Sequence, residues 1–195
     1  MLRDNEHGTS EPTAEKEEMI INEWNELLFN VRRSIRYHSK RAGWFEFCSK
    51  CATAFAIFFS TGSVVAITKI CAELSIATSV SVALVSTISL VFGWSQREHL
   101  HADLKRKFAE LEKAMVKCLN PGEKILAEMT AERLSIEEYE PKKVDVLDVI
   151  CHNELCIAQG YGDIWKVSWL YSKICHLDPP YKNPKIERTI GMALA

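Results

Sequence analysis

Two long uncharged stretches lie close together in the first half of the chain. The first, Cys51–Thr68, has 18 residues without a charge, and the second, Leu74–Trp94, has 21. A helix rises about 1.5 Å per residue, so the longer stretch extends about 30 Å, the thickness of the hydrocarbon core of a bilayer. Only Lys69–Glu73 separates them, which is enough for a tight turn. The pattern predicts a transmembrane hairpin with helices at about 48–68 and 74–94.

The same two stretches could instead be buried helices of a soluble, all-helical domain. Serine and threonine dilute both stretches, and the mean hydropathy of the chain is −0.08. Each strongly apolar residue favours membrane insertion by about 0.3 to 0.6 kcal/mol. Ten such residues give the second stretch about 3 to 6 kcal/mol, and seven give the first about 2 to 4 kcal/mol. We therefore expect the second stretch to insert well and the first to need its neighbour.

Basic residues gather at the two outer ends of the predicted hairpin, whereas Lys69 is the only one in the turn. Because basic flanks stay on the cytoplasmic side, we expect both termini in the cytoplasm. Trp44 and Trp94 lie where aromatic side chains anchor helices at the membrane interface. The flanking basic residues are Arg32, Arg33, Arg36, Lys40, Arg41, Lys50, Arg97, Lys105, Arg106 and Lys107.

Composition limits the partners of the chain. A net charge of −2 over 195 residues gives no reason to expect a nucleic-acid partner. The local basic flanks are instead suited to anionic lipid. The seven cysteines are expected to be reduced and mostly buried, because disulfides are rare in the cytoplasm. The polar, acidic N-terminal segment does not have the pattern of a cleavable signal peptide.

The expected fold class is all-α, an integral membrane hairpin with coiled-coil-like extensions and a small C-terminal helical region. We expect a disordered segment at 1–12, the hairpin region at 13–119, a cytoplasmic helical extension at 120–178 and a tail at 179–195. Apolar residues recur every three or four positions on both sides of the hairpin, which predicts two stripes that pack as an antiparallel coiled coil. The stripes are Ile20, Trp24, Leu27 or Leu28, Val31 and Ile35, then Leu100, Leu104, Phe108, Leu111, Met115 and Leu119.

Capping signals divide the extension into further helices. Asn120 as N-cap predicts a helix to about Leu134, and Ser135 with Glu138 predicts another start. A third helix is expected at about 143–159, stopped by Gly160, with Val144, Leu147, Cys151, Leu155 and Ala158 buried. A fourth is expected at about 163–177, carrying Trp165, Trp169, Leu170 and Ile174. No strand is predicted.

The motifs for catalysis and metal binding are weak. No phosphate-binding glycine loop, metalloprotease motif, nucleophile elbow or paired-carboxylate motif occurs, so we expect no enzyme, no cofactor and no metal. The closest approach to a zinc site combines cysteine and histidine near the C-terminus, but Cys151 and His152 are adjacent and point about 100° apart on a helix. Cys48 and Cys51 form a weak CxxC, and His99 and His101 are interpreted as polar residues at headgroup level.

Hydroxyl groups are the most informative chemistry of the second stretch. Five positions share one face at helical spacing: Ser75, Ser79, Val82, Ser86 and Ser89. In an oligomer this face could line a polar pore, with Arg97 and His101 near its cytoplasmic mouth. Alternatively, small and hydroxylated residues allow close helix packing, here against Ala52, Ala54, Ala56 and Gly62 of the first stretch. The sequence favours the packing alternative slightly and leaves both open.

Short motifs on both sides of the hairpin resemble those of the SLATT family, the two-transmembrane effector domains of bacterial conflict and defence systems. The motifs are Tyr37-His38-x-x-Arg41-Ala42-Gly43-Trp44 before it and Trp94-x-x-Arg97-x-x-x-His101 after it, leading into the second stripe. The resemblance covers about residues 24–119. A later segment, Cys151-His152-Asn153-Glu154 through Gly160-Tyr161 to Trp169, resembles the cytoplasmic extension of bacterial members.

This resemblance implies a multi-pass protein of the bacterial inner membrane that forms homo-oligomers. It further implies a membrane effector in antiphage defence or abortive infection, which forms a pore or perturbs the membrane when a separate sensor or activating protein signals infection. No catalytic residue carries over from the family. The alternative is a membrane-anchored scaffold whose cytoplasmic helices recruit a partner protein, without conduction.

Overall fold

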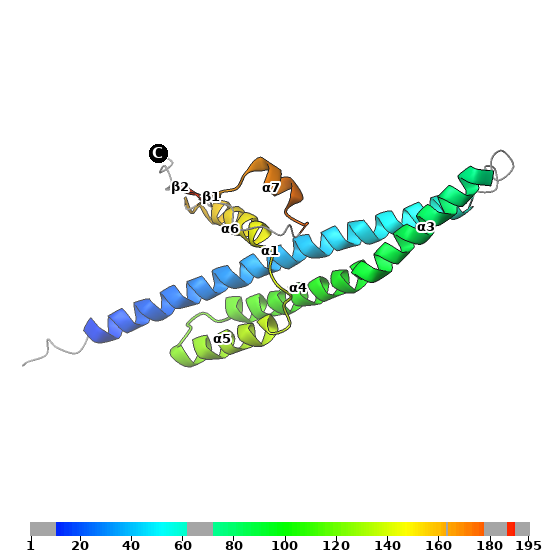
Figure 1. The fold of residues 1–195 in the computed structure, drawn as a ribbon. Coiled ribbons are helices and arrows are strands. Elements are labelled where there is room, and N and C mark those ends of the chain that lie inside the picture. The colour runs from blue at the N-terminus through cyan, green and yellow to red at the C-terminus, as the bar shows by residue number, and fades with distance from the viewer. Residues whose placement is uncertain (1–10, 62–71, 163, 178–186, 190–195) are drawn as a thin grey trace, which may run out of the picture. The chain divides into compact units, whose positions relative to one another are not determined.

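The computed structural model describes residues 11–61, 72–162, 164–177 and 187–189 and is predominantly helical, as the sequence predicts. Figure 1 shows the order of the elements. They are α1 (Glu11–Thr61), α3 (Ala72–Phe92), α4 (Trp94–Lys117), α5 (Glu123–Glu137), α6 (Asp145–Gln159), β1 (Ile164–Lys166), α7 (Trp169–Ile174) and β2 (Glu187–Thr189). The chain divides into two compact units: the first contains Met1–Tyr37 and Leu104–Ala195, and the second contains His38–Asp103.

Helix α1 is longer than the sequence predicts. Two helices were expected, one from about Thr13 and one from about position 48, but Glu11–Thr61 is a single helix of 51 residues. No proline follows Pro12 until Pro121, so nothing in this part of the sequence removes a backbone donor or blocks the preceding turn. Glu11 and Pro12 are helical although disorder was expected there, and the rest of that segment lies outside the described residues.

The core of the first unit joins the two predicted stripes. Trp24, Leu27 and Val31 of α1 form one buried cluster with residues of α4 and α5. The other buried members are Leu104, Phe108, Leu111, Met115, Leu126 and Ile136, with Ile20, Leu28 and Ile35 packed against them. Residues of both stripes therefore share one buried core, to which α5 adds a third helix (Figure 1).

The ends of the second stripe differ from the prediction. Leu119 is 90% exposed and Leu100 is 38% exposed. Leu119 lies beyond the end of α4 at Lys117, so the helical period no longer directs its side chain toward α1. Leu100 belongs to the second unit, whereas the cluster is part of the first.

Two ion pairs follow the antiparallel direction of α1 and the returning chain within the first unit. The Arg32 Nε donates to the Glu112 Oε1 at 2.7 Å, and both side chains are about one-third exposed or less. Nearer the start of α1, Lys16 Nζ lies 2.8 Å from Glu123 Oε2. Higher residue numbers on α1 thus pair with lower numbers on the return. The Lys16 ammonium lowers the pKa of the Glu123 carboxyl through this hydrogen bond.

Helix α5 begins and ends later than predicted. Its N-cap is Gly122, not Asn120, and it runs through to Glu137. The second start expected at Ser135 is wrong, because the Ser135 hydroxyl donates to the Glu132 carbonyl at 2.8 Å inside the same helix. A serine in a continuing helix can bond a carbonyl of the preceding turn instead of capping a new one.

Helix α6 follows the prediction closely. Gly160 ends it in a left-handed conformation with φ of 76°, and the Tyr161 N–H donates to the Cys156 carbonyl at 2.8 Å. Such a glycine satisfies the last carbonyls of a helix. Four of the five side chains expected to be buried are buried, whereas Ala158 is exposed. Within the first unit, the Tyr37 hydroxyl of α1 accepts a hydrogen bond from the buried Val144 N–H at 3.0 Å, next to α6.

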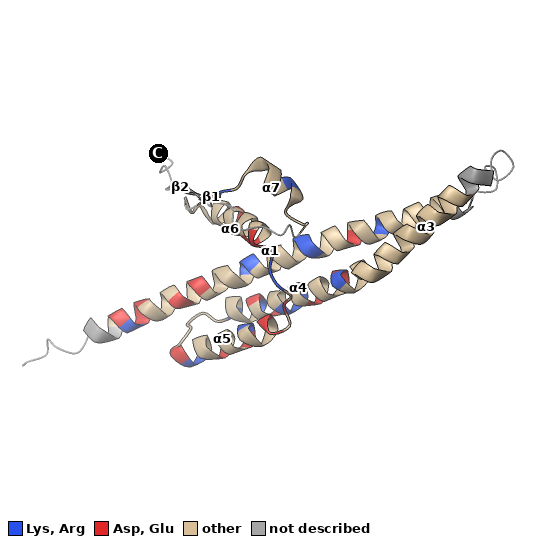
Figure 2. Ribbon diagram, in the orientation of Figure 1, with Lys and Arg blue, Asp and Glu red and all other residues tan. Residues whose placement is uncertain are grey.

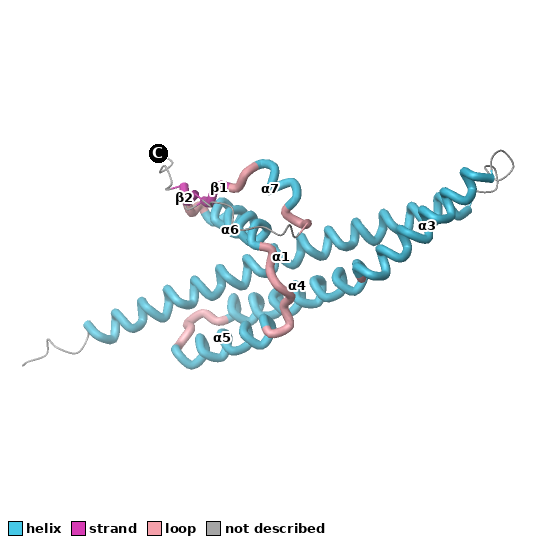
Figure 3. The backbone as a smooth tube through the Cα atoms, in the orientation of Figure 1, coloured by secondary structure: helices cyan, strands magenta, loops and turns pink. Residues whose placement is uncertain are grey.

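The fourth predicted helix is wrong over its first half. Ile164–Lys166 forms β1, which pairs antiparallel with β2, with Trp165 opposite Arg188 (Figure 3). The side chain of Asn153 holds both backbone groups of Trp165: its Nδ2 donates to the Trp165 carbonyl at 2.6 Å, and its Oδ1 accepts from the Trp165 N–H at 2.9 Å. These bonds occupy groups that a helix would use. Helix α7 therefore covers only Trp169–Ile174.

Candidate membrane-spanning segment

Helix α3 supplies the candidate site. One helical run among the described residues, Ile76–Lys117, is long and apolar enough to cross a membrane, and none of the residues in its apolar window is buried. A core helix of a soluble protein has a similar composition but is mostly buried. In Figure 2, α3 carries no blue or red segment over its described apolar length. Residues 51–61 of α1 contain no charged residue either.

Large apolar side chains are exposed on α1 and α3 within the second unit. An apolar surface of this kind is unusual on a soluble monomer and is typical of a contact with lipid or with another protein. The exposed residues of this surface are Ile57, Phe58, Ile76, Val80, Leu84, Leu90, Val91 and Phe92. The expected turn and the end of the first span, 62–71, lie outside the described residues, whereas Ala72 and Glu73 are already helical in α3.

Several hydroxyl groups are satisfied within their own helix. The Ser81 hydroxyl donates to the Ala77 carbonyl at 2.8 Å, and the Thr87 hydroxyl donates to the Ala83 carbonyl at 2.8 Å. A polar group placed in hydrocarbon is costly unless it is hydrogen-bonded. These internal bonds make Ser81 and Thr87 compatible with a lipid environment.

The expected hydroxyl face is divided between two environments. Ser79 and Ser86 are exposed, and Val82 and Ser89 are partly buried, while the side chain of Ser75 lies outside the described residues. Ser86 and Ser89 also line a hollow of about 380 Å³, which they share with Ala52 and Ala56 of α1. Part of the face thus lies beside the small residues with which the packing alternative pairs it.

Gly93 separates the apolar helix from the charged one. It has a left-handed φ of 59° and stands between the last residue of α3 and the first of α4. Its N–H donates to the Ser89 carbonyl at 3.1 Å, and its carbonyl accepts from the Arg97 N–H at 3.0 Å, so hydrogen bonding continues across the junction. The Trp94 ring follows directly, with its centroid 6.2 Å from that of Phe92, while the Trp44 centroid lies 6.2 Å from that of Phe47. Both tryptophans are partly buried.

A buried aromatic and basic cluster forms beside this junction, within the second unit. The His38 and His101 side chains are 0% and 3% exposed, and their rings stack with centroids 5.1 Å apart. The Phe45 ring stacks on His101 with centroids 5.6 Å apart. Two guanidinium groups face the Phe45 ring: the Cζ of Arg41 lies 4.6 Å and that of Arg97 5.9 Å from its centroid.

The sequence indicated only part of this cluster. Arg97 is exposed, whereas His101 is buried against His38 and Phe45. The spacing of the two histidines along the sequence could have indicated that they are buried. His101 precedes Leu104 by three positions, and His38 follows Ile35 by three, so both histidines continue the apolar stripes.

The residues weighed as metal ligands do not form a site in the described part of the chain. No group of three or more His, Cys, Asp or Glu side chains able to hold a metal ion occurs among the described residues. The Cys156 Sγ lies 3.4 Å from the His152 Nε2, and the Phe29 ring meets the His152 ring edge-on at 5.2 Å. This arrangement is a packed pair of side chains on α6.

No protein-family model, curated protein or solved structure matches the chain. The fold and the candidate site together define the class: a predominantly helical protein with one helix, among those described, that has the length and composition to cross a membrane.

Proposed function

We propose that the chain is a membrane effector that oligomerises in the bacterial inner membrane and opens a pore or perturbs the bilayer, with both termini in the cytoplasm. The observation that supports this best is the apolar length of α3, which has no buried residue in its apolar window. Lipid is the environment in which exposed apolar side chains on a helix of this length cost least. The resemblance to SLATT effectors of antiphage defence supplies the biological setting.

The hollow shared by α1 and α3 supports oligomerisation. It is lined by small side chains, including Ala52, Ala56, Ser86 and Ser89. Small residues let helix backbones approach closely in lipid and let hydroxyl groups bond across the contact. A helix from a neighbouring copy could pack against Ala52 and Ser89 at this hollow, which would turn the exposed Ser79 and Ser86 side chains of several copies toward a common axis.

Conduction can be tested with two matched double variants. In Ser79→Leu with Ser86→Leu, we expect unchanged membrane insertion but loss of toxicity and of membrane depolarisation, because two hydroxyls of the proposed lumen become apolar. The control is Ser81→Leu with Thr87→Leu, which removes two hydroxyls bonded within the helix. Expression in bacteria with a membrane-potential dye measures both. Depolarisation that survives the first pair would refute the lumen assignment.

The alternative function is a membrane-anchored scaffold whose helices recruit a partner without conduction. The position of Ser86 and Ser89 beside Ala52 and Ala56 of the same chain favours it, since these residues then serve only the packing of one hairpin. Wild-type expression separates the two functions. A pore depolarises the cells, whereas an anchor leaves the membrane potential unchanged at the same level of inserted protein.

A further inference from the structure

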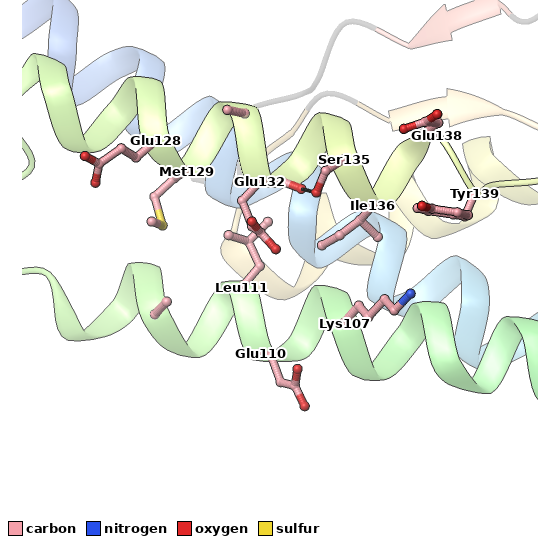
Figure 4. A pocket seen from close by; sticks show the side chains of 12 residues that line it. Lys107, Glu110, Leu111, Glu128, Met129, Glu132, Ser135, Ile136, Glu138 and Tyr139 are labelled. Atoms are coloured by element: carbon pink, nitrogen blue, oxygen red, sulfur yellow. Dashed lines mark hydrogen bonds between the residues drawn. The ribbon is translucent and has the colours of Figure 1, made fainter.

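A groove of about 980 Å³ lies between α4 and α5 in the first unit (Figure 4). Leu111 and Ile136 line it and belong to the buried core, so this part of the lining is held in place by packing beneath it. Met129 adds a flexible apolar side chain, while Ala114 and Ala131 are exposed and small. The two alanines leave room that larger residues at these positions would fill.

Acidic side chains surround this groove. Glu110, Glu128, Glu132 and Glu138 line it, against the single basic side chain of Lys107. Lys107 is itself engaged, because its Nζ lies 5.1 Å from the centroid of the Tyr139 ring. The lining therefore carries three more carboxylates than ammonium groups, four against one.

The neighbouring cations neutralise this charge only weakly. Arg106 lies 3.7 Å from Glu110 and Lys124 lies 4.0 Å from Glu128, and all four side chains are well exposed. Exposed pairs of this kind contribute little.

The remaining two carboxylates lack even such a neighbour in the described part of the chain. Glu132 and Glu138 have no ion pair with any residue that the structure describes. In Figure 4 the Glu132 carboxylate points from α5 toward Leu111 on α4. Negative charge thus lies directly beside the apolar lining.

We propose that this groove binds a basic amphipathic helix of a partner protein. The lining residues of α5 and the turn after it run from Glu128 to Tyr139, which corresponds to about 16 Å, or three helical turns. A helix of that length would place its apolar face on Leu111, Met129 and Ile136 and its lysines or arginines beside the carboxylates. This is the usual arrangement for an amphipathic helix in a groove, with charge setting orientation and partner choice.

Other occupants fit the charges less well. Anionic lipid would be repelled by the four carboxylates. Of the basic residues that a second copy of this chain would offer from α1, Arg32 is already paired with Glu112 and Arg33 lies 3.5 Å from Asp148 in the same unit. A partner with unengaged basic residues therefore matches the groove best.

The inference extends the proposed function by naming the chemistry of its activating partner, and it can fail separately. The groove belongs to the first unit and the candidate span to the second. Peptide binding measures the groove, whereas depolarisation measures the span. If the chain binds the peptide but does not depolarise cells, the proposal for the groove stands and the proposal of a pore is refuted.

The probe is a synthetic helical peptide of about 14 residues, with leucines along one face and lysines on both flanks. Its binding to the full chain in nanodiscs of neutral phosphatidylcholine is measured by fluorescence anisotropy, and empty nanodiscs give the lipid background. We expect saturable binding, weakened about tenfold or more in Glu132→Lys with Glu138→Lys. The matched control, Glu18→Lys with Glu26→Lys, reverses two exposed charges on α1 and should bind as the wild type does.

A second pair of variants tests the shape of the groove. Ala131→Trp should block the peptide, whereas Ala127→Trp should not, because both alanines are exposed on α5 but only Ala131 lines the groove. The proposal is overturned if the wild type binds no peptide, or if a peptide with glutamates in place of the lysines binds equally well. It is also overturned if Ala131→Trp instead dissociates a homo-oligomer in sedimentation, since the groove would then hold a second copy.

Discussion

The Nδ1 atom of His38 on α1 lies 2.9 Å from the Nδ1 atom of His101 on α4, and both imidazoles are buried. This distance allows one Nδ1 to donate a hydrogen bond that the other accepts, and the tautomers of the two rings decide which one donates. Residues 63 positions apart in the sequence are thereby joined at the end of the apolar segment. The Phe45 ring also stacks on His101 and is itself faced by two arginines.

The histidine contact predicts coupled effects on stability. His38→Ala, His101→Ala and the double variant form a cycle in which the double variant loses less than the sum of the single ones. Because the rings share a hydrogen bond and a stacked contact, we expect a coupling energy of about 0.5 to 3 kcal/mol. Thermal unfolding of the full chain in nanodiscs measures it. Additive losses would show that the two rings do not stabilise each other.

Tyr37→Phe is expected to destabilise the first unit by about 1 to 3 kcal/mol, because it removes the acceptor of the buried Val144 N–H. The ring itself remains, so the change isolates the hydroxyl. Hydrogen exchange at the start of α6 should increase in parallel. Tyr139→Phe is the control: Tyr139 is exposed, and its contact with Lys107 needs only the ring. Equal stability of the two variants would contradict the assignment.

Two glycine-to-alanine changes should have opposite signs. Gly93→Ala is expected to destabilise the chain by about 1 to 2 kcal/mol, because a side chain is strained at positive φ. Gly43→Ala should stabilise it by about 1 kcal/mol, since Gly43 lies inside α1 and an added Cβ meets nothing within 4 Å. Differential scanning calorimetry of both proteins tests this. A stabilised Gly93→Ala protein would indicate that α3 and α4 can join as one regular helix.

Phe108 and Leu119 belong to the same sequence stripe but should respond differently to truncation. Phe108→Ala is expected to cost about 3 to 5 kcal/mol, because its side chain is fully buried in the core of the first unit. Leu119→Ala should change stability by less than about 0.5 kcal/mol, since Leu119 is 90% exposed. Chemical unfolding monitored by tryptophan fluorescence compares them. A large loss in Leu119→Ala would mean that another copy covers that side chain.

Much of the candidate site follows from sequence, but its environment does not. The length of the stretch without charged residues identifies α3, and helical spacing places Ser79, Val82 and Ser86 on one face. Whether such a face meets solvent, lipid or a neighbouring helix depends on residues distant in sequence. Only the structure places Ser86 beside Ala52 and Ala56.

The sequence by itself determined the elements whose signals are local: the apolar length of α3, the period of the stripes and the stop of α6 at Gly160. Tertiary structure alone decided the pairing of His38 with His101 and the strand at Trp165, which Asn153 holds through two hydrogen bonds. The physical reason is the distance along the sequence over which each interaction acts. Helical period and capping act within a few residues, whereas a buried hydrogen bond depends on which distant segment the fold brings within about 3 Å.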